Sequence, residues 1–426
     1  MALPEIKASA TDARLADLTA PIGAAWADSA RKRAHNSVVA MGLPHKRDEY
    51  WRYTDPSALV EPTVDAAPAD AETALSADRA CLKVVFVDGA FDAAQSDDLT
   101  AENLEITTLE QATAADIHWA KEVFGVCEAA GQRPVERPLA ALNTAFASAG
   151  IVLRATGAVA KPVLVVYQRT ATATDVMVHH VIRVDEGASL TVLETGTGGA
   201  RFSQVMEVEL ADKAAFHHIR TQGPVQERQV VTHCFAKVAA EASFKSFTMA
   251  ANGTLTRNEC VIEITGDDAT AHVAGTCLGD GGDFHHDDTV FITHDAVNCE
   301  SRQVFKKVLR NGATGVFQGK ILVKADAQKT DGYQISQSLL LDDDSQFLAK
   351  PELEIYADDV ACSHGSTSGA IDETALFYLR SRGVPHREAI DLLTLAFLAE
   401  ALEEVDDAAL AEDLRAVLED WLAMRG

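Results

Sequence analysis

Residues 206–216, with the sequence MEVELADKAAF, decide the fold of this chain. Met206, Val208 and Leu210 alternate with glutamates, and this period of two predicts a strand with one buried face and one solvent-exposed face. The strand runs into the turn KAAF at 213–216, where a charged residue is followed by two small residues and the start of another strand. The stretch therefore predicts two short strands joined by a tight turn.

The same turn recurs along the chain at a nearly constant interval. Its copies begin at Gly187, Lys213, Glu241, Asp268 and, more loosely, Asp295, which gives steps of 26, 28, 27 and 27 residues. Later copies at 312–314 and 344–346 break the step but keep the turn. A period in the twenties that carries two or three short strands is typical of a β-solenoid, whereas a β-sandwich places turns about every 8–12 residues without the longer period.

The chain as a whole is predicted to be mainly β, with a solenoid core between helical regions. We place an N-terminal helical region and linker at 1–80, a mixed α/β region at 81–149, the solenoid at 150–371 and a C-terminal helical region at 372–426. The ends of a solenoid expose strand edges and core, so we expect helices to cap both of them.

The N-terminal region shows helical spacing. Leu15, Leu18, Ile22 and Trp26 recur at three and four residues, which predicts one continuous helical face. Gly42 is expected to end the second helical run, because a helix often ends at a glycine with positive φ.

The junction between this region and the core has two further features. A linker rich in Ala, Asp and Pro is predicted at about 60–80, followed by a strand at 82–87. The segment LPHKRDEYWRYT at 43–54 places three aromatic residues within four positions of an otherwise acidic chain. Such a segment is typical of a packed anchor or a docking element, and the simpler alternative is an ordinary junction between a helix and the core.

The C-terminal region is predicted to hold three helices. Asp372 is expected to cap the first helix, which Gly383 ends. Pro385 can open the second helix as a first-turn residue, and a third is expected over 406–424.

The charge of the chain excludes several classes of partner. The net charge is −27 over 426 residues, and no basic stripe is visible. Neutralising phosphates needs such a stripe, so we expect neither nucleic acid nor an anionic membrane surface as a partner. The start of the sequence lacks the basic and apolar segments of a signal peptide, and no apolar run approaches the length of a membrane span.

The cysteines argue against a disulfide framework. Their number is odd, they contain no CxxC pair, and a reducing cytoplasm suits them better than an oxidising compartment. They are widely scattered, at Cys81, Cys127, Cys234, Cys260, Cys277, Cys299 and Cys362.

One cysteine has a histidine beside it at the end of a predicted strand. Cys362 and His364 are two residues apart, so strand spacing points both to one face. A thiol and an imidazole side by side can bind a soft metal or an iron–sulfur intermediate, or share a proton. One pair cannot complete a four-ligand site, so further ligands would come from elsewhere or from another chain. The alternative is a buried cysteine and a hydrogen-bonded histidine.

Three histidine pairs look metal-like but are expected to be structural. Adjacent residues of a strand point to opposite faces, so the two members of a pair cannot easily chelate one ion. We expect polar strand starts on the surface at 179–180, 217–218 and 285–286.

Two other patterns are given structural interpretations. The segment GVFQGK at 315–320 is one residue short of a phosphate loop, and Ile321 stands where a magnesium ligand is needed, so its glycines are expected to mark a solenoid corner. The acidic run at 342–344 is expected to be a surface turn. No nucleophile-elbow, zinc-protease or dinucleotide-binding pattern appears, which leaves a solenoid enzyme acting on an acidic or sugar polymer as a weak alternative.

Several motifs together are similar to one family. The chain resembles the SufB/SufD family of iron–sulfur cluster assembly scaffolds, and its SufD branch in particular. The matching motifs are GLP at 42–44, DExWRYT at 48–54, GVFQGK at 315–320, QKTD at 328–331, KPxLEIYADDV at 350–360, CSHG at 362–365 and DExxLFYLxSRG at 372–383.

The resemblance implies a fold, partners and a role. It implies a right-handed parallel β-helix flanked by helices, which joins SufB through the end of the β-helix and binds two copies of the ATPase SufC. It also implies a scaffold without catalytic activity, with ATP hydrolysed on SufC, sulfur supplied by SufE or a cysteine desulfurase, and an iron–sulfur cluster present only transiently in the complex.

The resemblance also assigns residues. The histidine at the SufB–SufD interface, where the cluster forms, corresponds to His364, and Cys362 is its neighbour; these two are the candidates for transient metal ligands on a chain with no stable metal of its own. The helices at about 373–404 are implied to bind SufC. Their candidate contact residues are Leu376, Phe377, Tyr378, Arg380, Ile390, Leu393 and Phe397.

Alternatives within and outside the family stay open. SufB-type sequences carry an asparagine-rich stretch with Cys-Asp where this chain has YQISQS at 333–338, and His-Glu-Ala-Thr where it has CSHGST at 362–367, so a SufB-type scaffold is the less favoured alternative. Ser366 replaces the more usual SufD alanine. The isolated chain could form a homodimer, or act as a homodimeric adaptor outside the pathway. The sequence does not decide whether it binds a flavin.

Overall fold

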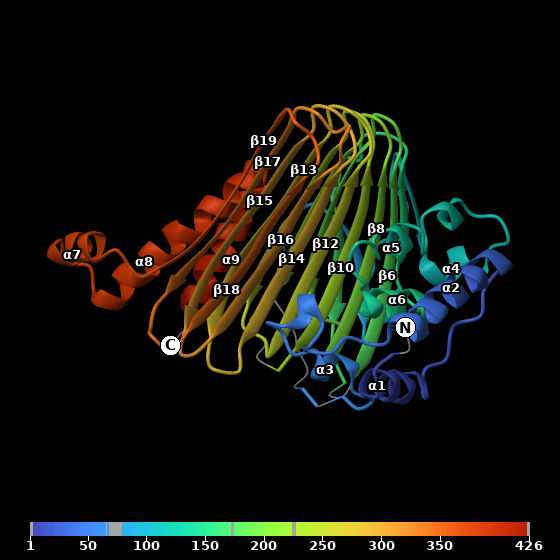
Figure 1. Ribbon diagram of the computed structural model, residues 1–426, viewed down its shortest axis with the longest axis horizontal. Helices are drawn as coiled ribbons and strands as arrows, with labels where there is room; N and C mark the ends of the chain where they lie inside the picture. The colour runs from blue at the N-terminus through green and yellow to red at the C-terminus, as the bar shows by residue number, and fades with distance from the viewer. Residues whose placement is uncertain (1–2, 65, 68–78, 172–173, 224–226, 424–426) are drawn as a thin grey trace.

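The computed structural model describes residues 3–64, 66–67, 79–171, 174–223 and 227–423. The chain is a parallel β-helix flattened into two sheets, with helices at both ends of the sequence (Figure 1). The predicted mainly β solenoid is thus confirmed, whereas most of the predicted linker at 60–80 lies outside the described residues.

Successive strands of the solenoid alternate between the two sheets, so each rung contributes one strand to each sheet. The ten-stranded sheet contains β1 (Leu82–Val87), β2 (Ala90–Phe91), β5 (Val163–Gln168), β7 (Ser189–Gly196), β9 (Ala215–Gln222), β11 (Ser243–Ala251), β13 (Thr270–Asp280), β15 (Glu300–Arg310), β17 (Thr330–Leu340) and β19 (Val360–Gly369). The nine-stranded sheet contains β3 (Leu104–Thr108), β4 (Ile151–Ala155), β6 (Asp175–Val184), β8 (Arg201–Leu210), β10 (Gln229–Val238), β12 (Leu255–Ile264), β14 (His285–His294), β16 (Thr314–Val323) and β18 (Gln346–Ile355).

Pairing between the described strands of the core is parallel, and the first strands of the two sheets depart from it. β2 pairs antiparallel with β1, and β3 pairs antiparallel with β4. The strand predicted at 82–87 is β1, and it pairs in parallel with β5, so the mixed α/β region supplies the first strands of both sheets.

The repeated turn forms one corner of the solenoid. Lys213, Glu241 and Asp268 each have φ near +60°, and the N–H of each donates to a carbonyl of the next rung. The bond from Glu241 N–H to the Asp267 carbonyl, for example, is 2.8 Å long. These turns therefore stack through their backbones, which explains why the pattern recurs with each rung.

The fifth copy of the turn is not where the sequence placed it. The residue with positive φ is Asn298 (φ 60°), not Asp295, so this rung is 30 residues long, from 268 to 298. Asparagine tolerates the left-handed region better than most residues, which makes it a suitable corner residue. The next corner residue is Lys329, also at φ 60°.

The space between the two sheets is mainly an apolar core, with a polar strip through it. Alternate residues of each strand point inward, and Phe202, Val208, Phe244, Ile262 and Phe317 are representative members of the main cluster. The polar strip is a series of buried hydrogen bonds between the sheets, and Glu194, Arg220 and Lys307 are among its charged members.

The N-terminal helices cover the outer face of the nine-stranded sheet (Figure 1). α6 packs on β6 and β8, and α5 packs on β8 and β10. The elements of this region are α1 (Glu5–Leu15), α2 (Ala25–Met41), η1 (Glu49–Trp51), α3 (Ser57–Val60), α4 (Leu109–Ala114), η2 (Trp119–Glu122), α5 (Cys127–Ala130) and α6 (Pro138–Phe146).

Covering this face overturns two predictions of exposure. Glu207, expected on a solvent-exposed face, is buried and accepts hydrogen bonds from the N–H groups of Gly125, Val126 and Glu128.

The histidine pairs do point to opposite faces of their strands, but they are not surface residues. Among the buried ones are His179, beside Glu207, and His180, inside the solenoid. His217 and His285 are only partly exposed, and His218 and His286 are fully buried inside the solenoid.

The predicted continuous helical face from Leu15 to Trp26 is wrong. α1 ends at Leu15 and α2 begins at Ala25, so Leu18 and Ile22 lie between the helices, where Ile22 is 96% exposed. Pro21 explains the break, because proline lacks the N–H that a helix interior needs. α2 ends at Met41, and Gly42 follows with φ +66°, as predicted.

The aromatic segment is a packed anchor. Tyr50 and Trp51 are buried, and the Arg257 guanidinium lies 4.1 Å from the centre of the Trp51 ring. Thr54 Oγ1 donates to Asp287 at 2.6 Å. The segment thereby ties the N-terminal region to β12 and β14.

The C-terminal helices do not cap the solenoid as predicted. They are α7 (Glu373–Ser381), α8 (His386–Ala399), η3 (Glu400–Glu404) and α9 (Ala408–Ala423). Leu410, Leu414 and Leu418 of α9 join an apolar cluster on the outer face of the ten-stranded sheet, and η3 packs on β13 and β15. None of the described helices therefore lies across the end of the final rung, β18 and β19, and α7 projects away from the body (Figure 1).

Two of the three local signals at these helices are as predicted. The Asp372 side chain accepts hydrogen bonds from the N–H groups of Thr374 and Ala375 at the start of α7. Gly383 has φ +89° just after this helix, as predicted. Pro385, predicted as a first-turn residue of the second helix, instead lies just before α8, with an extended ψ of 149° at the cap position.

The buried histidines predict a loss of stability in mild acid. Burial lowers the pKa of His294 to about 4, and its Nε2 lies 2.9 Å from Ser301 Oγ. Because the folded pKa lies below the ordinary value, the unfolded chain takes up the proton first as pH falls. The contribution of neutral His294 is thus complete above pH ~6.5 and is lost between pH ~6.5 and the folded value. One such histidine should cost about 2 kcal/mol of unfolding free energy between pH 7 and 5.

Chemical denaturation at pH 7 and pH 5 tests this. His294→Asn should lower stability at pH 7 but should show a smaller loss between the two pH values than the unmodified chain. His386→Asn, at an exposed position of α8, is the control and should leave the pH dependence unchanged. An identical pH dependence for His294→Asn and the unmodified chain would show that His294 does not control acid stability.

Candidate functional site

The final rung is an open end with two unprotected strand edges. β18 pairs with β16 and β19 pairs with β17, and within the described residues neither has a sheet partner on its other side. Unpaired N–H and C=O groups along such edges are a template for pairing with another chain, which folded proteins usually block. An uncovered end of this kind is therefore a candidate interface.

The inward-facing side chains of the rung are accessible because no further rung covers them in the described part of the chain. On β18, Phe347 and Leu353 are partly buried and Ile355 is 39% exposed. On β19, Cys362 is partly buried and His364 is exposed. The end therefore offers apolar contact area on one strand and a thiol and an imidazole on the other.

Cys362 and His364 lie on one face of a strand, as the sequence predicted, but near the start of β19 rather than at the end of a strand. Cys362 contacts the small apolar cluster that contains Ile321 and Val323, which places its side chain between the sheets. Since His364 is two residues further along, its side chain points the same way.

The Cys362 thiol is held in its protonated form. Burial raises the pKa of Cys362; a backbone hydrogen bond with Gly332 lowers it by less, and the Asp331 carboxylate adds a smaller rise. A protonated thiol is a weak metal ligand, so Cys362 would need a change of surroundings to bind iron.

The His364 ring has no polar side-chain contact among the described residues. Within the described part of the chain, no side chain forms a hydrogen bond or ion pair with it, and no three His, Cys, Asp or Glu side chains are grouped closely enough to hold a metal ion. The imidazole is thus available to a ligand that arrives from outside the chain.

A ladder of polar side chains lies directly beneath His364. His364 pairs with Gln334 of β17, which pairs with Gln303 of β15. Gln334 Nε2 donates to Gln303 Oε1 at 2.7 Å. On the same strands, the hydroxyls of Ser336 and Ser366 lie 2.7 Å apart and Ser338 donates to Ser368 at 3.0 Å.

The glycines at 315–320 lie within β16, not at a solenoid corner as predicted. A Cβ on Gly319 would lie 1.6 Å from Gln334 Nε2, so the glycine leaves the space that this amide occupies. Gln303 and Gln334 were not among the predicted site residues, although polar side chains alternate along the strand from Gln334 to Ser338 and give a visible signal.

The candidate SufC contacts on α7 and α8 differ in exposure. Phe377 and Tyr378 are 74% and 53% exposed, whereas Leu376 is buried. Phe397 packs against the solenoid, with the Lys306 ammonium 4.5 Å from its ring centre. Arg380 is exposed, and Ile390 and Leu393 are partly buried. The exposed aromatic surface is thus concentrated on α7.

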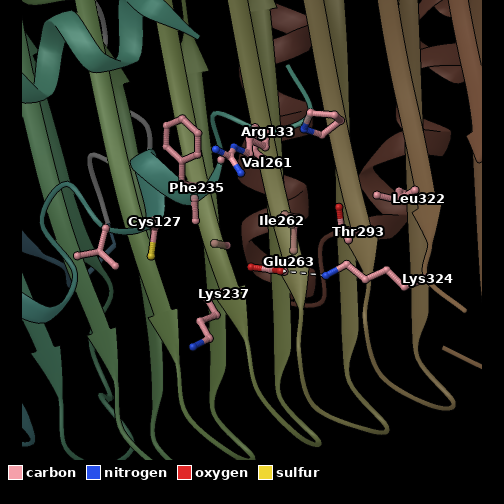
Figure 2. A pocket seen from close by; sticks show the side chains of 15 residues that line it. Cys127, Arg133, Phe235, Lys237, Val261, Ile262, Glu263, Thr293, Leu322 and Lys324 are labelled. Carbon is pink, nitrogen blue, oxygen red and sulfur yellow. Dashed lines mark ion pairs between the residues drawn. The ribbon is translucent and has the colours of Figure 1, made fainter. Parts of the chain in front are cut away.

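A hollow of about 710 Å³ lies elsewhere, on the outer face of the nine-stranded sheet (Figure 2). Phe235, Val261 and Leu322 line its floor, and Lys324 Nζ lies 3.6 Å from Glu263 Oε1 at its edge. Cys127 also lines it, and burial holds the pKa of this thiol well above its ordinary value. The hollow contains none of the predicted site residues.

The chain is similar to proteins of one system. Residues 167–397 match the family model described as SUF system FeS cluster assembly, SufBD core domain. The iron-sulfur cluster assembly protein SufD of Escherichia coli is 28% identical over 408 residues, covering 89% of both chains. A SufBD family protein of Synechocystis is 27% identical over 90% of this chain and 89% of its own. SufD of Bacillus subtilis is 27% identical over 68% of each chain.

Proposed function

This chain belongs to the SufB/SufD family of iron–sulfur cluster assembly proteins, and we propose that it acts as the SufD-type scaffold subunit of a SufBCD complex. The observation that carries this proposal is the open end of the solenoid, where two unprotected strand edges frame His364 and Cys362. The described helices include none that is long and apolar enough to cross a membrane. We place the complex in the cytoplasm, which suits seven free cysteines.

SufB is the proposed partner at the open end. A second solenoid of similar cross-section can continue the sheets across the junction, so that β18 and β19 gain backbone partners. Such pairing would also bury Leu353 and Ile355, whose apolar side chains point into the junction. The inward-facing His364 would then lie at the boundary between the two chains.

The cluster is cargo in this proposal, and this chain supplies few ligands for it. His364 offers an imidazole nitrogen, and Cys362 offers a thiol whose pKa is raised by burial. Iron–sulfur clusters are held mainly by thiolates, so the other ligands would come from SufB. We propose no catalytic step on this chain, and we assign ATP hydrolysis to SufC.

SufC is proposed to bind α7 and the start of α8. The supporting observation is that α7 projects from the body and presents Phe377 and Tyr378 to solvent. Aromatic side chains are enriched among residues that dominate binding energy at interfaces. Phe397 of α8 instead packs on the solenoid, so it attaches α8 to the body of the protein.

Phe377→Asp is expected to release SufC while leaving SufB bound. A buried, unpaired carboxylate in place of an aromatic anchor should weaken binding by about 2 kcal/mol or more, roughly thirtyfold. The measurement is the amount of SufC that co-purifies with the affinity-tagged full chain when all three proteins are co-expressed.

The matched control is Val39→Asp, which adds the same charge at an exposed apolar position of α2. It should leave SufC recovery unchanged. If Phe377→Asp retained as much SufC as the control, SufC would bind elsewhere on the chain.

A further inference from the structure

We propose that Gln334 is a positioning residue for His364: its side-chain oxygen accepts the N–H of one imidazole nitrogen and leaves the other nitrogen free for the cluster. This proposal rests on the proposed function, because it assigns Gln334 a role only through His364. It concerns the complex, in which a partner covers the open end and restricts the ring.

The first support is the register of the final rungs. Gln303, Gln334 and His364 occupy equivalent positions on three neighbouring parallel strands. In a parallel sheet, residues in register point to the same side and stack about 4.8 Å apart. The ring of His364 therefore has the Gln334 amide as its neighbour along the solenoid axis.

The second support is an unused acceptor. Gln334 is fully buried, and its Nε2 is committed to Gln303. Among the described residues its Oε1 has no hydrogen-bond partner, which is costly for a buried polar atom. A ring N–H from His364 would satisfy that oxygen and extend the ladder by one step.

The third support is the space provided for the amide. Gly319 of β16 faces Gln334 across the interior, and any Cβ there would collide with Nε2 at 1.6 Å. The same Cβ would lie 2.8 Å from Gln303 Oε1. The glycine thus preserves the amide pair.

Side chains at neighbouring positions of β17 and β19 already form hydrogen bonds between the two strands. The hydroxyl pairs Ser336–Ser366 and Ser338–Ser368 join β17 to β19, two and four residues beyond Gln334 and His364. The link between Gln334 and His364 is the missing member of this row.

A bond of this kind matters for metal binding. A neutral imidazole has one N–H and one lone pair, and the partner of its N–H decides which nitrogen carries the lone pair. Groups that hold the N–H of a histidine ligand typically change metal affinity or activity by about 10–100-fold when removed. Without Gln334, the ring would exchange between its two neutral forms and its orientations.

The experiment compares Gln334→Met, Gln334→Glu and His364→Ala in the co-purified full complex. Methionine keeps the length of glutamine but cannot accept the ring N–H strongly. Glutamate retains the acceptor, and Gln303 can rotate its unpaired Nε2 to donate to it. Each complex is checked for subunit composition, then assayed for cluster assembly with iron, cysteine and a cysteine desulfurase.

A second readout is the ring itself. The histidines of this chain are labelled with ¹⁵N in the complex without cluster, and the His364 signal is identified by its loss in His364→Ala. We expect one neutral form in the unmodified and Gln334→Glu complexes and a mixture in Gln334→Met. Cluster assembly should fall about 10–100-fold in Gln334→Met, and Gln334→Met should add nothing to His364→Ala.

The outcomes separate the two proposals. If His364→Ala leaves assembly unchanged, the proposed role of His364 is wrong. If His364→Ala abolishes assembly while Gln334→Met alters neither assembly nor the ring signals, the role of Gln334 is wrong and that of His364 stands. Loss of assembly in both Gln334 variants with an unchanged ring signal would also overturn the proposal, because it would indicate a structural defect.

Discussion

Replacing Glu194 with alanine is expected to lower the free energy of unfolding by about 3–5 kcal/mol, because it leaves a buried guanidinium without its counter-ion. Glu194 lies inside the solenoid, and its Oε2 accepts from Arg220 Nη2 and His218 Nε2, each at 2.7 Å. Its Oε1 accepts from Tyr167 at 2.6 Å and from Gln204. One carboxylate therefore satisfies donors from several rungs.

The contacts of Glu194 favour its charged form. Burial alone would raise its pKa, but the Arg220 guanidinium and the His218 ring hold the pKa of Glu194 well below its ordinary value. Since the folded pKa is depressed, this stabilisation is present above the unfolded pKa of about 4.3 and is lost as pH falls toward the folded value. The alanine variant should thus be least stable, relative to the unmodified chain, at neutral pH.

Urea denaturation at pH 7 measures the effect. Glu209→Ala is the matched control, because Glu209 pairs with Arg183 at 2.6 Å on a partly exposed surface. Surface pairs contribute about 0–1 kcal/mol, so the control should change little. Equal effects of the two substitutions would show that the interior network does not stabilise the solenoid.

Ile355→Asp is expected to abolish stable pairing with SufB while leaving the fold intact. Ile355 is on the inward face of β18 at the open end, where its side chain is 39% exposed in the isolated chain. Pairing would bury it, so an aspartate there would carry an unpaired charge into the interface. A cost of about 3 kcal/mol corresponds to more than a hundredfold weaker association.

The control is Ile117→Asp, which places the same charge at an isoleucine that is 88% exposed in the N-terminal region. Both variants should have the denaturation midpoint of the unmodified chain. Size-exclusion chromatography with light scattering on equimolar mixtures with SufB gives the association. Normal pairing of Ile355→Asp with SufB would move the interface away from the open end.

The fold could be predicted because its signal repeats. One alternation of apolar residues is weak evidence, but the turn at Lys213 and its copies recur with every rung, and their backbone hydrogen bonds explain the period. The predicted corner positions became wrong where the rungs lengthen, because the fifth corner residue is Asn298 rather than Asp295.

Exposure was harder to predict than strand positions. A charged residue in a strand usually marks a wet face, so Glu207 was expected in solvent. In the structure, the N-terminal segment 125–128 covers that face and donates three N–H groups to this carboxylate. Such a contact depends on where a segment from another part of the chain packs, and the periodicity of a strand carries no information about that.

The candidate site could be predicted only in part. Local spacing was enough to place Cys362 and His364 on one face of a strand. Local spacing could not predict the neighbouring pair Gln303 and Gln334, because these residues are 31 positions apart in the sequence. They meet only through the register of the last rungs, where the period inferred from the earlier turns no longer holds.

We propose that this chain is a scaffold subunit that joins SufB through its open end and carries SufC on its C-terminal helices. The most direct measurement is to co-express the affinity-tagged full chain with SufB and SufC and to determine the composition and mass of what co-purifies. We expect one stable complex that contains all three proteins. Recovery of this chain alone, or only with itself, would contradict the claim.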